Sequence, residues 1–117
     1  MTFSNQMKLR SKNIGLEVIK VIEFLPQKPT AWVLSKQVLR SSTSIGANYR
    51  AAYRAKSKAD FINKLKIVEE EADETIYWLE VLQESGLINP LNLKSLMIET
   101  SEILSIVVRS IKTAREH

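Results

Sequence analysis

The helix-breaking residues constrain this chain most, because they are few and lie at the ends of long uninterrupted segments. Two prolines fall at positions 26 and 29, a third falls at position 90, and Gly86 lies just before it. Between these points apolar residues recur every three or four positions, which is the period of a helix with one buried face. We therefore predict four helices, at about residues 8–25, 31–55, 58–85 and 90–115.

Capping signals support these boundaries. Thr30, Ser57 and Asn89 each precede a predicted helix, and side-chain oxygens of this kind accept hydrogen bonds from a first helical turn. Pro90 suits the first position of the fourth helix, where no backbone donor is needed. Gly86 can adopt the left-handed conformation that ends the third helix.

Short connections make consecutive helices antiparallel. The fold class that we predict is all-α: an antiparallel up-down four-helix bundle that forms a single domain over residues 1–117. The predicted core consists of helically spaced positions on the last three helices: Val38, Ile45, Tyr49 and Ala52; Phe61, Leu65, Val68, Ala72, Leu79 and Leu82; Leu93, Leu96, Thr100, Ile103, Val107 and Ile111.

Gly46 stands inside the second predicted helix, where a glycine costs about 1 kcal/mol relative to alanine. The four residues from Ser41 to Ser44 all carry hydroxyl groups, which compete for backbone hydrogen bonds and weaken the helix further. We predict a kinked second helix, or a close approach of another helix at Gly46.

The composition excludes several classes of function. The chain has no cysteine, so disulfides, thiol catalysis and cysteine metal sites are ruled out. No apolar run approaches the ~18 residues of a membrane span. The N-terminal residues contain no hydrophobic stretch of the signal-peptide kind, so we expect a cytoplasmic location.

The charge pattern changes sign within the chain. Residues 36–68 carry eight bases and one acid, whereas residues 69–84 carry seven acids and no base. When the second and third helices fold back on each other, Arg40 comes level with Asp73, and Lys36 comes level with Tyr77 and within reach of Glu80. We expect these pairs to neutralise part of the pattern, at ~0–1 kcal/mol for each exposed pair.

The tip of this predicted hairpin is not neutralised in the same way. Asp60 is the only local acid, and the candidate phosphate-binding residues are Arg50, Arg54, Lys56, Lys58 and Lys64. Their partner is either a nucleic-acid backbone or the acids of a neighbouring copy in a head-to-tail ring. The third alternative is a solvated tip that has no partner. Glu71 and Glu74 have no evident partner on their own hairpin. Together with Trp78 and Val81, which add a second apolar stripe, they are the candidate oligomer interface.

The acidic segment does not complete a known catalytic site. A di-iron bundle requires Glu-x-x-His pairs, and the only histidine is His117. A magnesium-dependent nucleoside-triphosphate pyrophosphatase uses Glu-x-x-Glu on one helix and Glu-x-x-Asp on the next. Glu70 and Asp73 match the second pair, but no acids upstream of residue 69 lie three positions apart. We predict a protein that is not an enzyme and has no cofactor or metal, with the pyrophosphatase as a remote alternative.

Three segments resemble a known family. They are "LRSSTSIGAN" (39–48), "RAKSKADFINKL" (54–65) and "EADETIYWLE" (71–80). In combination they are similar to the bacterial four-helix-bundle proteins encoded in intervening sequences of large-subunit ribosomal RNA genes. Many members carry an "IAEG"-like stretch after the asparagine, whereas Asn48 is followed by "YRAAYR", which makes this tip more basic.

The resemblance implies a bundle that assembles with itself into a homopentameric ring. A related branch, the accessory proteins of diversity-generating retroelements, works with nucleic acid and a reverse transcriptase. We therefore expect a non-enzymatic oligomeric bundle that binds structured RNA or DNA through its basic tip. The alternative is a purely structural assembly module with no nucleic-acid ligand, and no small-molecule substrate is evident in either case.

Overall fold

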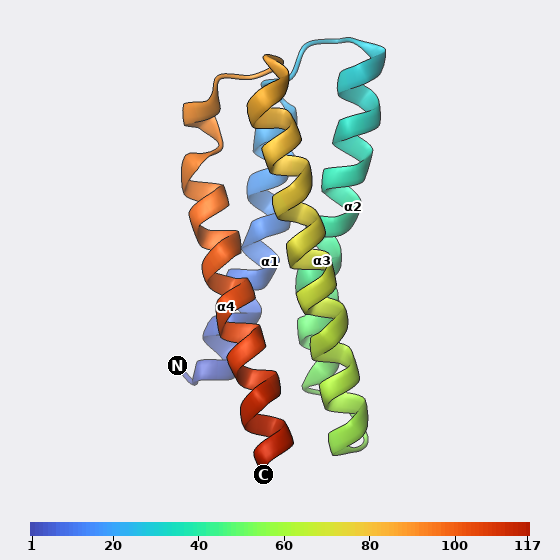
Figure 1. Cartoon of the computed structure of the whole chain (residues 1–117), viewed down its shortest axis with the longest axis vertical. Helices are drawn as coiled ribbons and strands as arrows, with labels where there is room; N and C mark the ends of the chain where they lie inside the picture. Colours follow the sequence, from blue (N-terminus) through green and yellow to red (C-terminus); the bar gives the residue numbers. More distant parts are fainter.

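The computed structural model describes all 117 residues as an antiparallel bundle of four helices (Figure 1). The helices are α1 (Phe3–Ile22), α2 (Pro29–Ala52), α3 (Lys58–Ser85) and α4 (Lys94–Glu116), with a short 3₁₀ turn, Pro90–Asn92, before α4. The bundle is elongated, with principal extents of 47 × 22 × 21 Å. None of its helices combines the length and the hydropathy that a membrane crossing requires.

The bounds of α3 match the prediction. The Ser57 side chain accepts a hydrogen bond from the Asp60 backbone N–H, and Gly86 ends the helix with a φ of 76°. Asn89 is also a capping residue, but its side chain accepts a hydrogen bond from the Leu91 backbone N–H and therefore caps the 3₁₀ turn, not α4. α4 itself begins four residues later than predicted, at Lys94.

The ends of α1 and α2 differ from the prediction. α1 begins at Phe3 because the Thr2 side chain accepts a hydrogen bond from the Asn5 N–H and caps the helix five residues earlier than expected. Thr30 is not the cap of α2, because that helix already begins at Pro29. Proline suits this first position because its missing N–H would have no partner there.

The predicted core is confirmed. Fifteen of the sixteen predicted positions are buried, and the other, Phe61, is partly buried and packs against the core. α1 completes the core with Met7, Ile14, Val18 and Val21. Every buried side-chain nitrogen or oxygen has a hydrogen-bond partner, as between Thr75 and Ser41, whose hydroxyl oxygens lie 2.9 Å apart across the α2–α3 seam.

Gly46 lies where the backbones of α2 and α1 pack closely together. A Cβ atom at this position would meet the Lys12 backbone at 2.9 Å, so the close approach predicted from the sequence is present. α2 is one continuous helix through this point, and the kink stays a prediction.

Candidate nucleic-acid interface

The predicted basic tip lies at one end of the bundle, where α2 ends and α3 begins. Arg50 is on the last turn of α2, Arg54 and Lys56 are in the connecting loop, and Lys58 is the first residue of α3. These four side chains are exposed, and Lys64, two turns into α3, is half-buried. None of the five takes part in an ion pair. The structure therefore brings the predicted phosphate-binding residues together and leaves their charge uncompensated.

Two further helices add bases to this end, which the sequence-based prediction missed. α1 begins and α4 ends at the same end as the α2–α3 loop (Figure 1). The bases here that form no ion pair, which we call the basic end, are Lys8, Lys12, Arg50, Arg54, Lys56, Lys58, Lys64, Lys66, Arg109, Lys112 and Arg115. In an up-down bundle the start of the first helix and the end of the fourth lie at the same end as the loop between the second and third. The predicted topology could therefore have placed the bases of α1 and α4 at this end.

The charge is separated along the long axis of the bundle. Residues 1–12, 41–71 and 106–117 make up the half that contains the basic end. They carry twelve Lys or Arg and five Asp or Glu, whereas the other half carries five bases and eight acids. The two halves have net charges of +7 and −3, so the electrostatic potential is more positive at the basic end.

An aromatic cluster lies beneath the basic end. The Tyr49 and Tyr53 hydroxyl oxygens are 3.2 Å apart, and Tyr53 packs edge-on against Phe61 with ring centroids 5.4 Å apart. The Lys8 ammonium lies 5.3 Å from the centroid of the Tyr53 ring, a cation–π contact that joins α1 to this cluster. Tyr49 is fully buried, and its desolvation raises the pKa of its hydroxyl well above the ordinary value.

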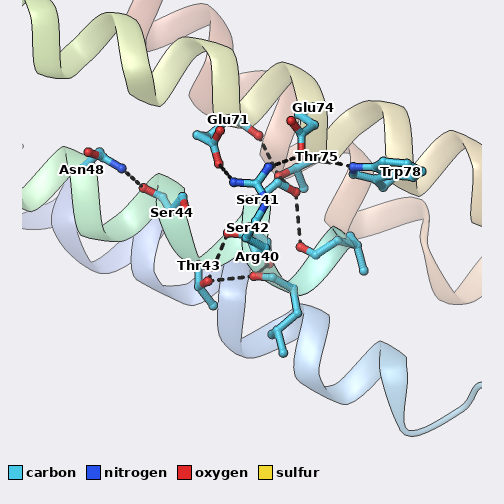
Figure 2. Close-up of polar contacts among 12 residues, drawn as sticks. Arg40, Ser41, Ser42, Thr43, Ser44, Asn48, Glu71, Glu74, Thr75 and Trp78 are labelled. Atoms are coloured by element: carbon cyan, nitrogen blue, oxygen red, sulfur yellow. Dashed lines mark hydrogen bonds and ion pairs between the residues drawn. The ribbon is translucent and has the colours of Figure 1, made fainter. Parts of the chain in front are cut away.

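Arg40 is a structural residue, but its partner is not the predicted one. Its guanidinium binds Glu71, with an N–O distance of 3.0 Å, and also Glu74 (Figure 2). The hydrogen bond that Arg40 donates to Glu74 and the charge of Glu71 raise the pKa of Arg40. The prediction of Asp73 was wrong because each helical residue turns by about 100°, so Asp73 points away from the α2–α3 seam that Glu71 and Glu74 flank.

The same contacts correct the expectation that Glu71 and Glu74 lack a partner on their own hairpin. Within residues 69–84, the acids that form no ion pair are instead Glu69, Glu70, Asp73, Glu80 and Glu84. Lys36 pairs with neither Glu80 nor any other acid. No three His, Asp or Glu side chains gather closely enough to hold a metal ion.

Three of the four predicted interface residues, Glu74, Trp78 and Val81, lie in the half of the bundle away from the basic end. Trp78 is half-buried, and its indole N–H donates a hydrogen bond to Glu74 (Figure 2). The Trp78 ring packs edge-on against Tyr77, which is exposed. Val81 is half-buried and lines a shallow depression with Tyr77, Glu80 and Glu84. Their role in assembly stays a prediction.

Comparison with known proteins gives one family. The family model described as "23S rRNA-intervening sequence protein" matches residues 4–109. A solved structure from Bacteroides thetaiotaomicron, described as a protein with unknown function from the S23 ribosomal protein family, superposes with a TM-score of 0.84. It is 42% identical, and the alignment covers 91% of this chain and 98% of that chain. No curated protein matches the sequence.

Proposed function

Because this chain belongs to the family of 23S rRNA-intervening sequence proteins, we propose that it is a non-enzymatic protein that binds structured RNA or DNA at its basic end. The observation that carries this proposal is the set of eleven bases without ion pairs that four helices bring to one end. Like charges at this density repel one another, and a polyanion is the partner that relieves the repulsion over the whole end.

The contacts would be made chiefly with phosphates. Arg54 and Lys56 lie in an exposed loop, and Lys58 lies in the first turn of α3, where the helix dipole disfavours a base. Lys58 therefore gains nothing from its own helix, and an external anion is the partner that suits it. Phosphate contacts give affinity without reading sequence.

The test is a salt series of binding measurements with a structured RNA and a duplex DNA. Affinity should fall steeply with salt, because each neutralised phosphate releases counterions. The double substitution Arg50→Glu/Arg54→Glu should abolish binding. Lys28→Glu/Lys36→Glu is the matched control, since it changes the net charge equally at two exposed, unpaired bases of the other end. Absence of binding at low salt would refute the proposal.

A second candidate is a structural assembly protein, a homo-oligomer whose basic end meets the acids of the next copy. The five unpaired acids within residues 69–84 and the exposed Tyr77 beside Trp78 favour it. The family resemblance predicts a homopentameric ring. Sedimentation separates the two candidates: Arg50→Glu/Arg54→Glu dissociates the oligomer in the assembly case and leaves it intact in the nucleic-acid case. Val81→Glu tests the interface independently of the basic end.

A further inference from the structure

A groove opens in the basic end between the first turn of α1, the first turn of α3 and the last turns of α4. Its volume is about 570 Å³, within the range of small-ligand sites. The side chains that decide its chemistry are Phe3, Phe61, Ile106, Arg109, Thr113 and His117. It is distinct from the α2–α3 loop, and neither the predicted tip nor the aromatic pair Tyr49 and Tyr53 contributes to it.

The groove combines flat aromatic surface with positive charge. Phe3, the first residue of α1, has a side chain that is 56% exposed. The ring of Phe61 is held in place by its edge-on contact with Tyr53. Arg109 is exposed and makes no ion pair. An occupant that suits both features has a flat apolar face joined to an anion.

We propose that this groove receives one unpaired nucleotide of a bound strand, its base against Phe3 and Phe61 and its phosphate at Arg109. The inference rests on the proposed function and narrows the ligand: a structured nucleic acid with a bulged or looped-out nucleotide is bound more tightly than a continuous duplex. A base within a duplex has both faces covered by its neighbours, so it cannot present a face to the phenyl rings. Aromatic stacking of this kind tolerates every base.

The test compares two RNAs that share one stem, the first with a single bulged nucleotide and the second fully paired. The wild-type protein should bind the bulged RNA about tenfold more tightly. Phe3→Ala should remove this preference and leave the affinity for the paired stem and its salt dependence unchanged. Phe24→Ala is the matched control, because Phe24 is an exposed aromatic residue at the opposite end of the bundle.

A fluorescent 2-aminopurine at the bulge reports on stacking directly. Its emission should be quenched on binding to the wild-type protein and to Phe24→Ala, and much less on binding to Phe3→Ala. Equal affinity for the two RNAs, with no effect of Phe3→Ala on affinity or on quenching, would refute the proposal that the groove receives an unpaired nucleotide. The proposed function would be unaffected by that result. Failure to bind either RNA at low salt would overturn both.

Discussion

Gly46 lies so close to Lys12 that a Cβ atom added to the glycine would stand 2.9 Å from the Lys12 Cα and 3.0 Å from its backbone nitrogen. The atoms in the way belong to the backbone of α1, so a change of side-chain rotamer cannot remove the clash. The contact explains why α2 keeps a glycine in its interior at a cost of about 1 kcal/mol: it sets the spacing of α1 and α2.

Gly46→Ala should therefore lower the free energy of unfolding, although alanine is the better helix former. Overpacking costs about 1–3 kcal/mol, which exceeds the gain in helix propensity. Urea unfolding followed by circular dichroism measures the difference. Gly15→Ala is the control, because its Cβ would meet mainly the Thr43 methyl group, at 3.1 Å, and that side chain can move. An effect of Gly15→Ala as large as that of Gly46→Ala would contradict this account of the α1–α2 contact.

Arg10 joins α1 to α4. Its Nε and Nη2 atoms donate to the two oxygens of Glu99 at 2.9 and 2.7 Å, and Nη2 also lies 2.9 Å from Glu102. Arg10→Lys should lower stability by about 1 kcal/mol or less, because an ammonium cannot form the paired bonds of a guanidinium. The loss should shrink at high salt. Lys20→Gln, which removes only the exposed pair with Glu17, should change stability by less than Arg10→Lys at every salt concentration.

We expect Tyr49 to make the stability of the protein depend on pH in the alkaline range. Its pKa is raised in the folded state by burial and by the hydrogen bond with Tyr53, so above pH ~10 the unfolded state loses a proton that the folded state keeps. The stabilisation is complete below that pH and declines above it by up to about 1.4 kcal/mol per pH unit. The pKa of Arg10 is raised too, by its bond to Glu99, so its ion pair persists through this range.

Tyr49→Phe should therefore be destabilising near neutral pH, where it loses a hydrogen bond worth about 1 kcal/mol, and should flatten the alkaline decline. Unfolding free energies at pH 8 to 11 measure both effects. Tyr77→Phe, at an exposed phenol, is the matched control. If the wild-type protein and Tyr49→Phe lose stability in parallel above pH 10, the alkaline decline does not come from Tyr49.

Local signals in the sequence were sufficient for α3 and for the core. Ser57 and Gly86 act within one turn of themselves, so both ends of α3 were predictable. The start of α1 was not, because residues 3–6 show little apolar periodicity and only the Thr2 cap marks the beginning. Apolar spacing locates the helical segments that pack, and it says little about polar turns that extend beyond the core.

Contacts between helices were less predictable. Arg40 could be placed near the acids of α3, but choosing among Glu71, Asp73 and Glu74 requires the rotation of α3 about its axis. The basic end was recognised only in part, since a hairpin was considered instead of all four helices. Lys112 and Arg115 lie more than fifty residues from the α2–α3 loop in sequence and reach the same end only through the fold.

These two α4 residues provide the sharpest test of the basic end as a unit. Lys112→Gln and Arg115→Gln should each weaken binding of a structured RNA and reduce the slope of log K against log salt by up to about 1, because each phosphate contact contributes about 0.9. Both side chains are exposed and form no ion pair, so stability should not change. Lys94→Gln is the control, since Lys94 is an exposed base at the other end of the same helix. A reduction by Lys94→Gln equal to that by Lys112→Gln would show that net charge, not its concentration at one end, governs binding.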